Sequence, residues 1–442
     1  MTLEHLKDIF RSNGCDKIYI KTLSANDNSK NQVYLSGSYE ILNIFPISEI
    51  KADSSGDWKK ERFKASINFG WITEDGDISD APGSQFILYP KYPEVRFSGF
   101  LQRCGNAPSG LMTQRLMGRL LFLAVSKEGK TLGYVVDPES PIARAIDALK
   151  LEKELGVFKV INLISPINNK LLLLNELYRI HNLGWIKSKR LHKTGELLPC
   201  IFSNCGGYTL EAELGISANG YSEPDYLGYE IKQFKSANFN RILNEVITLM
   251  TPEPNGGLYK EEGAISFINK YGYKDKSGKE DRLNFGGVHK MGVVQPLTGL
   301  TLELDGFDVV SSKIRNTNGS ISLIDSRGNQ ASSWSFTSLI EHWTKKHNLA
   351  CYVPSKSIKL PIQQYQYGNK VLLGDGTDFQ LFLKQMALGN IYYDPGIKME
   401  RASTLKPDVK KRSQFRIKSG NLIHLYKNSE TVDLLDRATY AQ

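Results

Sequence analysis

Short apolar runs separated by turn residues dominate the first 150 residues of the chain. The runs recur at roughly ten-residue spacing and are bounded by Gly, Pro, Asn and Asp. Strands at such regular spacing are typical of a small barrel or sandwich. The predicted strands cover residues 17–23, 32–37, 64–72, 84–90, 94–101, 119–126 and 131–136.

The pattern changes in the region that follows these strands. Residues 141–156 show helical spacing of apolar positions and end at Gly156, which predicts a closing helix that leads into a linker. A chain of 442 residues also exceeds the length at which one hydrophobic core usually stops growing. We therefore expect two domains, with boundaries at 1–150 for a β-rich domain, 151–164 for the linker and 165–442 for a second domain.

The second region mixes helical and strand patterns, which predicts an α/β domain. It opens with a helix at 168–184, where apolar residues cluster on one face and Gly184 provides the stop. The polar stretch 316–333 is expected to be a mobile loop. The other predicted elements are a loop at 187–207, a helix at 208–214, a strand at 227–234, a helix at 239–250, a helix at 334–348 and a strand at 349–355.

Composition narrows the class of protein. Hydrophobic residues make up 40% of the chain, no stretch approaches the roughly 20 apolar residues of a membrane span, and the N-terminus lacks a signal-peptide pattern. We expect a cytoplasmic protein with no membrane partner.

The five cysteines are scattered without a C-x-x-C pair, so we expect reduced thiols. The sequence contains no G-x-x-x-x-G-K-[ST] motif, so we expect no nucleotide cofactor.

Charge points to a polyanionic partner. The net charge is +9, and residues 391–420 carry eight Lys and Arg against three Asp and Glu. Basic runs are often solvated surfaces, but here Arg412 and Arg416 alternate with Gln414 and Phe415. Arginine is the commonest bidentate reader of guanine, so this segment is a candidate DNA contact.

The candidate chemistry lies in residues 206–235. Glu230 and Lys232 are two apart in a predicted strand and therefore project from the same face. Asp225 has the wrong parity for a straight strand, so a turn supported by Pro224 and Gly228 must re-aim it. Asp225 and Glu230 could then share a Mg²⁺ ion, the kind of hard cation that polarises a phosphoryl oxygen and activates water. Lys232 could orient that water.

A third carboxylate, Glu211, stands fourteen residues before Asp225 on a short predicted helix. It could hold a metal-bound water or a second ion. The alternative is a solvated strand edge, because D-x₄-E-x-K arises often by chance and paired Glu and Lys commonly face water.

The sequence that flanks these residues is a more specific indicator of function than the four residues alone. GYTLEAELGI and PDYLGYEIK resemble the MvaI and BcnI family of restriction endonucleases, which also resemble the mismatch-repair nuclease MutH. The resemblance covers about residues 165–442 and implies an α/β restriction-endonuclease-like (MutH-like) domain. It also implies an active site at Glu211, Asp225, Glu230 and Lys232.

The same resemblance implies a DNA-reading segment and a class of target. GNIYYDPGIK and KKRSQFRIK are similar to the family's major-groove recognition segment. Family members act as monomers on a short G·C-rich pseudopalindrome of the CC(A/T)GG or CC(C/G)GG kind. The implied DNA contacts in this chain are Asp394, Lys398, Lys411, Arg412, Gln414 and Arg416.

The N-terminal region resembles the effector DNA-binding domain of EcoRII-type restriction enzymes, a pseudobarrel that grips DNA with two arms. KIYIKTLSANDNSKNQVYLSG and YPEVRFSGFLQR carry the resemblance, although the first arm is shorter here. The first arm would supply Lys21, Ser24, Asn26, Asn28, Lys30 and Gln32. The second would supply Glu94, Arg96, Gln102 and Arg103.

These observations predict a Mg²⁺-dependent type II restriction endonuclease with an effector domain that binds a second copy of double-stranded DNA. Two alternatives remain open. A strand-nicking repair endonuclease would use the same chemistry, and a plasmid that is nicked but never linearised would indicate it. A non-catalytic DNA-binding regulator would bind without Mg²⁺-dependent cleavage.

Overall fold

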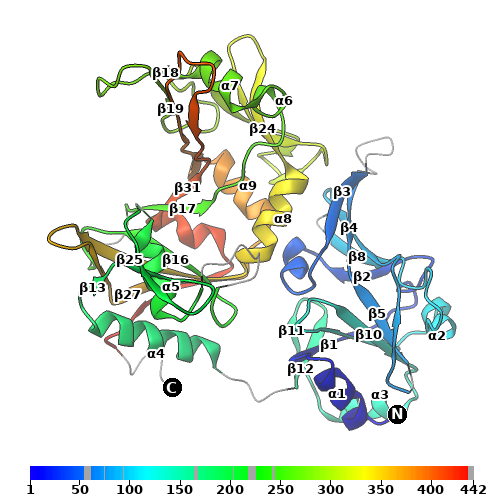
Figure 1. The fold of residues 1–442 in the computed structure, drawn as a ribbon. Coiled ribbons are helices and arrows are strands. Elements are labelled where there is room, and N and C mark those ends of the chain that lie inside the picture. Colours follow the sequence, from blue (N-terminus) through cyan, green and yellow to red (C-terminus); the bar gives the residue numbers. More distant parts are fainter. Residues whose placement is uncertain are drawn as a thin grey trace. The chain divides into compact units, whose positions relative to one another are not determined.

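The computed structural model describes residues 1–53, 61–73, 75–92, 94–163, 168–202, 204–217, 225–240 and 244–436. Its contacts divide the chain into two compact units, whose ribbons are drawn in Figure 1. Unit 1 is Met1–Ile167 with Lys313–Thr317, and unit 2 is Asn168–Ser312 with Asn318–Gln442. The described part of the chain holds no helix that is both long enough and apolar enough to cross a membrane.

Unit 1 is built on two sheets. In the seven-stranded sheet the order is β11 (Lys153–Leu155), β12 (Phe158–Asn162), β1 (Lys17–Thr22), β9 (Leu120–Val125), β10 (Thr131–Val136), β5 (Phe69–Ile72) and β6 (Ile78–Asp80). The central strands β9, β10 and β5 of this larger sheet are buried along nearly their whole length. In the five-stranded sheet it is β2 (Val33–Ser36), β8 (Glu94–Ser98), β7 (Gln85–Tyr89), β4 (Arg62–Ser66) and β3 (Glu49–Asp53). The β10 and β5 strands run parallel, while their neighbours pair antiparallel.

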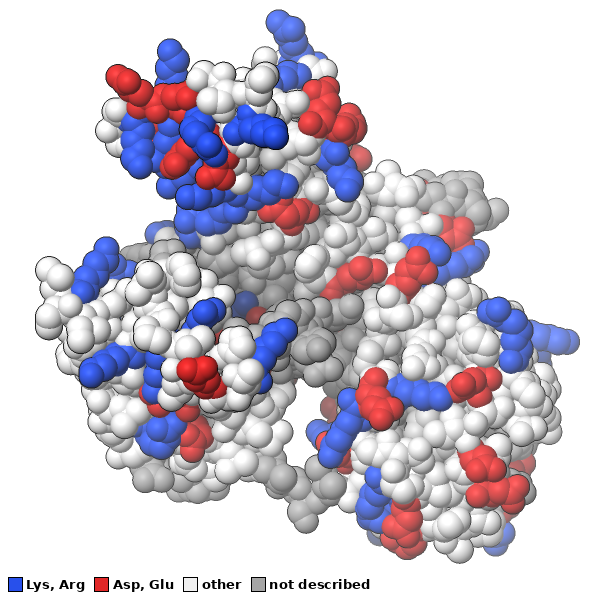
Figure 2. Space-filling model, viewed as in Figure 1, with Lys and Arg blue, Asp and Glu red and all other residues white. Residues whose placement is uncertain are grey.

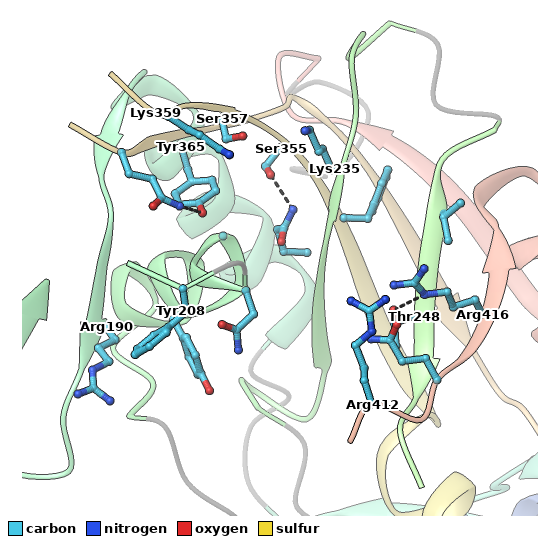
Figure 3. Close-up of a pocket in the computed structure, with 18 residues that line it drawn as sticks. Arg190, Tyr208, Lys235, Thr248, Ser355, Ser357, Lys359, Tyr365, Arg412 and Arg416 are labelled. Carbon is cyan, nitrogen blue, oxygen red and sulfur yellow. Dashed lines mark hydrogen bonds between the residues drawn. The ribbon is translucent and has the colours of Figure 1, made fainter. Parts of the chain in front are cut away.

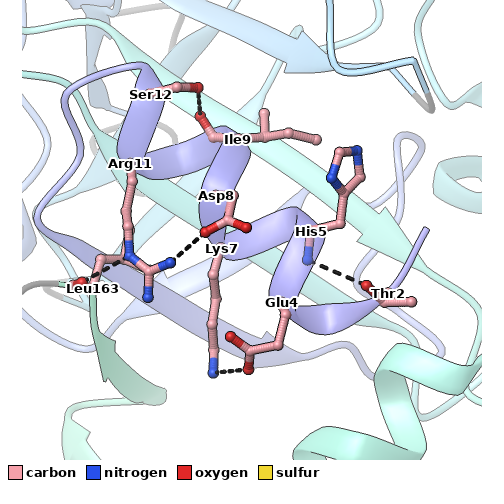
Figure 4. Close-up of polar contacts among 9 residues, drawn as sticks. All are labelled: Thr2, Glu4, His5, Lys7, Asp8, Ile9, Arg11, Ser12 and Leu163. Carbon is pink, nitrogen blue, oxygen red and sulfur yellow. Dashed lines mark hydrogen bonds and ion pairs between the residues drawn. The ribbon is translucent and has the colours of Figure 1, made fainter.

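The helices of unit 1 include one that the strand pattern did not predict, α1 (Leu3–Ser12). Its Leu6 and Phe10 are fully buried in a core shared with α3 (Pro141–Ala148). Figure 4 shows how polar contacts fix this helix: Thr2 caps the N-terminus by accepting from the His5 N–H at 3.2 Å. The short α2 (Ser109–Thr113) and the 3₁₀ turn η1 (Tyr39–Asn43) complete the unit.

Two predicted elements of unit 1 differ from the structure. The strand expected at 64–72 is two strands, β4 and β5, with a break between them. The helix expected to run to Gly156 ends at Ala148, because Lys150 adopts a left-handed φ of 49°. The chain then forms β11, which turns at Gly156 into β12.

The central sheet of unit 2 has six strands. Five of them follow the order β13 (Ile186–Lys187), β26 (Gln364–Tyr367), β25 (Leu349–Ile358), β27 (Lys370–Asp375) and β32 (Asn428–Asp433). The sixth, β16 (Glu230–Lys235), runs parallel to β25. One face of the sheet packs into a core with α4 (Asn169–Asn182) and α5 (Cys205–Glu213). The 3₁₀ turn η3 (Ser419–Leu425) also contacts the sheet, at β27 and β32.

The rest of unit 2 consists of small sheets and short helices. One three-stranded sheet is β17 (Val246–Met250), β31 (Phe415–Lys418) and β28 (Ile391–Tyr393), and another is β20 (Thr301–Asp305), β23 (Ser320–Ile324) and β24 (Gln330–Ser335). A four-stranded sheet contains β18 (Tyr273–Lys274), β19 (Arg282–Gly286), β29 (Gly396–Glu400) and β30 (Asp408–Lys410). The remaining elements are β14 (Lys189–Leu191), β15 (Leu197–Pro199), β21 (Phe307–Asp308), α6 (Leu258–Glu261), α7 (Gly263–Tyr271), α8 (Phe336–Lys346) and α9 (Phe379–Ala387), while β22 (Lys313–Ile314) falls in unit 1.

Three predictions for unit 2 are wrong. The stretch 316–333 is not a loop, because Ile321 and Leu323 alternate into the core and create the hairpin of β23 and β24. The helix expected at 239–250 gives way to β17, whose Ile247 and Leu249 are buried; residues 241–243 lie outside the described residues. The loop expected at 187–207 contains the hairpin of β14 and β15.

Candidate active site

The strand β16 separates an apolar face from a charged one. Tyr229 and Ile231 lie in the core that includes α4 and α5. Glu230 and Lys232 therefore project from the opposite face, as strand alternation requires. Lys232 is in register with Tyr352 of β25, so these two side chains are neighbours on that face. The predicted arrangement of the E-x-K pair is present in the structure.

A tight turn positions Asp225 beside the start of β16. Tyr226 and Tyr229 exchange backbone hydrogen bonds of 3.0 and 2.8 Å, and Gly228 between them has a φ of 86° that favours glycine. The turn directs Asp225 back to the strand, where its Oδ2 accepts the Ile231 N–H at 2.9 Å. The expected turn is present, although Pro224 lies outside the described residues.

Glu230 and Lys232 form a buried ion pair. Lys232 Nζ lies 2.9 Å from Glu230 Oε1, and Glu230 is only 4% exposed. Close by, His347 stacks on Trp343 and shares a 3.1 Å hydrogen bond between its Nε2 and the Leu249 carbonyl. Burial, together with the Lys232 charge, lowers the pKa of His347 to about 3, so the imidazole is neutral near pH 7.

A pair of buried tyrosines lies on the same side. The hydroxyls of Tyr352 and Tyr426 are 2.7 Å apart and hydrogen-bonded. Burial, and further the negative charge of Glu230, raises the pKa of each well above its ordinary value. Neutral hydroxyls and a neutral imidazole therefore lie near the Glu230–Lys232 pair.

The carboxylates are arranged around β16 without forming a closed cage. Asp225 and Glu230 belong to the same end of the strand, whereas Glu211 lies on α5, which packs against β14 and β16. Within the ranges that the structure describes, no group of three or more His, Cys, Asp or Glu side chains could hold a metal ion. The structure thus does not gather Glu211 with Asp225 and Glu230. Asp225 and Glu230, at the same end of the strand, are carboxylates of the kind that suits a hard divalent cation.

A cleft of about 980 Å³ opens next to this strand. Figure 3 shows Arg190 and Tyr208 on one wall and Thr248, Arg412 and Arg416 on the other, with β16 between them. The described lining residues include five cations and no Asp or Glu, the cations being Arg190, Lys235, Lys359, Arg412 and Arg416. Such a lining favours a polyanionic ligand. Figure 2 shows further Lys and Arg side chains, mixed with acids, over the lobe of β18 and β19.

Half of the six predicted DNA contacts of unit 2 line the cleft, namely Arg412, Gln414 and Arg416. Arg416 donates from Nε to Thr248 Oγ1 at 3.3 Å and forms an ion pair with Asp394, which fixes its guanidinium. Arg412 can approach the backbone because position 396 is glycine: a Cβ there would lie 2.6 Å from Arg412 Nε.

The other two basic candidates lie outside the described lining of the cleft. Lys398 is exposed on β29, where it pairs with Lys410 of β30. Lys411 is exposed with its Nζ 5.6 Å from the centre of the Tyr259 ring. Both remain predictions as DNA contacts.

Three cations of the cleft were not predicted from the sequence, and they lie on the wall opposite Arg412 and Arg416 or on the floor between the walls. Arg190 comes from β14, Lys235 from the end of β16 and Lys359 from the segment after β25. The basic stretch IKSKR around Arg190 could have indicated this wall. The thiol prediction is also wrong for two residues, because Cys200 and Cys205 form a disulfide. Cys15, Cys104 and Cys351 are free.

The first predicted arm of unit 1 is held by buried polar groups. Lys21 Nζ lies 3.0 Å from Asp27 Oδ2, and both side chains are 7% exposed. Asn28 is fully buried and bonds the Ala25 carbonyl and the Lys30 N–H. Arg119, also fully buried, donates to the carbonyls of the arm. Lys21 and Asn28 therefore shape the arm from inside, whereas Ser24, Asn26 and Lys30 are exposed and Gln32 is half-buried.

The second predicted arm begins on β8. Arg96 lies 2.8 Å from Glu94 Oε1 and stacks 5.3 Å above the centre of the Tyr89 ring, so both charged side chains are engaged at the sheet surface. Gln102 and Arg103 follow in an exposed turn, where Arg103 has a left-handed φ of 56°.

Comparison with known proteins assigns the chain. The model of the MvaI/BcnI restriction endonuclease family matches residues 174–426, more than half of the chain. Restriction endonuclease MvaI bound to its cognate DNA substrate is similar at 21% identity and a TM-score of 0.44, covering 61% of this chain and 99% of that one. MvaI without DNA is similar at 19% identity and a TM-score of 0.33, with the same coverage. No curated protein matches. The chain belongs to the MvaI/BcnI restriction endonuclease family.

Proposed function

We propose that this restriction endonuclease is a Mg²⁺-dependent type II enzyme that cuts double-stranded DNA with Glu211, Asp225, Glu230 and Lys232. The observation that carries the proposal is that one strand, β16, bears an acid–lysine pair and also borders a cationic cleft. Its first half bears the buried Glu230–Lys232 pair, and its second half forms the floor of the cationic cleft. A phosphate drawn into the cleft would arrive beside these two residues.

The residues divide the chemistry among them. Asp225 and Glu230 would hold Mg²⁺, which lowers the pKa of water and balances charge on the phosphoryl oxygens when bound. Glu230 holds Lys232 Nζ at 2.9 Å, so the ammonium is positioned to orient the attacking water. Glu211, on the neighbouring α5, would add a third carboxylate when DNA and the metal are bound, since the structure does not gather it with the other two.

Specificity would come from the wall that carries Arg416 on β31 and Arg412 just before it, which we call the β31 wall. Arg412 and Arg416 are suited to bidentate contacts with guanine, and Asp394 fixes Arg416 in place. Asp394, Gln414, Lys398 and Lys411 would complete the contacts. A target of the CC(A/T)GG or CC(C/G)GG kind supplies adjacent guanines on both strands, which matches an arginine pair. We propose a monomer, as expected from the family.

Unit 1 would act as the effector domain and bind a second DNA copy. Its exposed arm residues Ser24, Asn26, Lys30, Gln102 and Arg103 are the ones able to meet DNA, with Gln32, Glu94 and Arg96 beside them. Lys21 and Asn28 would contribute through the shape of the arm.

Digestion of a sequenced plasmid by the full chain, with Mg²⁺ or with EDTA, tests the proposal. We expect linear products whose mapped ends share one G·C-rich site, and no products with EDTA or from the Glu230→Ala variant. Nicked circles that never become linear would favour a repair nickase instead. Specific binding without any cleavage would favour a regulator.

A further inference from the structure

An apolar loop tip lies on the wall of the cleft opposite β31. Ile201 is 81% exposed and Phe202 is 57% exposed, directly after the buried Cys200. Single exposed apolar residues are common on proteins, but two adjacent large ones on a constrained loop are a candidate contact surface.

The loop is anchored at both ends. The disulfide joins Cys200 to Cys205, and both residues are at most 2% exposed. Ser188 Oγ donates to the Cys200 carbonyl at 2.6 Å, and the Phe202 N–H donates to Cys205 Sγ at 2.9 Å. The tip is therefore held in place before any ligand arrives, which limits the entropy that binding would cost.

The tip is continuous with the cationic cleft. Phe202 lines the cleft together with Arg190, Asn204 and Tyr208. Arg190 adds a positive charge to this wall. Figure 3 shows Arg190 and Tyr208 across the cleft from Arg412 and Arg416. DNA held between these walls would meet the two sets of residues from opposite sides.

The two edges of a base pair also face opposite sides of the duplex, one in the major groove and one in the minor groove. If the β31 wall reads the major-groove edge, the opposite wall faces the minor groove. We infer that Ile201 and Phe202 form a wedge that enters the minor groove and partly unstacks a base step. Apolar wedges of this kind bend DNA toward the major groove, here toward Arg412 and Arg416. The inference rests on the proposed function.

A duplex that contains the mapped cleavage site, with 2-aminopurine placed in turn along it, tests the wedge. Binding is measured without Mg²⁺, for the full chain and for an Ile201→Ala, Phe202→Ala double variant. We expect the full chain to raise 2-aminopurine fluorescence at one step and the double variant to lose that rise. Its affinity should fall by roughly tenfold to a hundredfold, the range set by loss of stacked or inserted side chains.

Leu388→Ala is the matched control, since Leu388 is 59% exposed at the end of α9 and lies outside the described lining of the cleft. It should bind and unstack like the parent, and all variants should share one unfolding midpoint. A double variant that keeps the fluorescence rise overturns the wedge, whatever its affinity. A parent that cuts and binds without unstacking any step overturns the wedge alone. A parent that neither cuts nor binds DNA overturns the proposed function.

Discussion

At the residue scale, the Glu230–Lys232 pair decides whether the cleft is an active site. We expect Asp225→Ala, Glu230→Ala and Lys232→Ala each to abolish cleavage, because these groups serve the metal and the water. Specific binding should stay within about tenfold, since none of them reads bases. Glu211→Ala should be impaired, and less severely. Single-turnover cleavage and binding of one mapped duplex would be compared; near-parental cleavage by the Asp225 or Glu230 variant contradicts the assignment.

A second residue-scale prediction concerns His289, which is fully buried. Its Nδ1 is 2.9 Å from the Gly287 carbonyl and its Nε2 is 2.9 Å from Thr298 Oγ1. Burial lowers the pKa of His289 to about 4 from the model-peptide value of 6.5. Because the unfolded chain takes up a proton first, stability should fall as the pH drops from 6.5 and the loss should level off near 4.

The size of this loss is about 3 kcal/mol, from about 1.4 kcal/mol for each pH unit across the window. Urea unfolding of the parent and of His289→Gln at several pH values between 7 and 4 would measure it. The variant should show the flatter profile over that window. Equal slopes would mean that His289 does not titrate differently in the folded and unfolded chains.

At the element scale, one prediction concerns how β31 and the segment before it recognise the DNA sequence. If Arg412 and Arg416 read guanines, each Arg→Ala change should cost roughly 1 to 3 kcal/mol on the cognate duplex and relax preference at one base position. Duplexes with single substitutions would be titrated against each variant. Arg327→Ala is the matched control, because Arg327 is exposed in the turn between β23 and β24 and lies outside the described lining of the cleft. Unchanged preference in both Arg variants would place recognition elsewhere.

The elements around the site were predictable where their pattern is local. The E-x-K strand alternates an apolar and a charged face, and the turn before it has a glycine where a positive φ is required, so both were read from the sequence. The strand β17 was mistaken for a helix, because its register is set by β31, which lies far along the chain. The serine-rich hairpin of β23 and β24 was mistaken for a loop, because few apolar residues mark its buried face.

At the scale of the whole molecule, the division of labour can be tested by truncation. A fragment that begins near residue 165 should fold alone and cut DNA, because every catalytic candidate lies beyond that point. Residues 1–163, which keep β11 and β12 of the seven-stranded sheet, should bind DNA and never cut it. Plasmid digestion and gel-shift assays of both fragments would be compared with the full chain and its Glu230→Ala variant. Nuclease activity in the N-terminal fragment would refute this division.

The cleft itself was out of reach of sequence reasoning. Its cations come from β14, β16, the segment after β25 and the β31 region, which lie far apart in the sequence. No local sequence pattern predicts that Arg190 and Arg412 line the same cleft. Only the tertiary fold brings them together.

The charge of that cleft has a consequence for how the enzyme would search DNA. With Arg412 and Arg416 assigned to guanine, the other three cations of the described lining would, on contact with three phosphates, release counterions and give log K a slope of about −2.7 against log salt. A fourfold rise in salt would then weaken binding by roughly one to two orders of magnitude. At low salt the protein would bind any duplex without regard to sequence. At physiological salt only sites that add base contacts would bind it long enough to be cut.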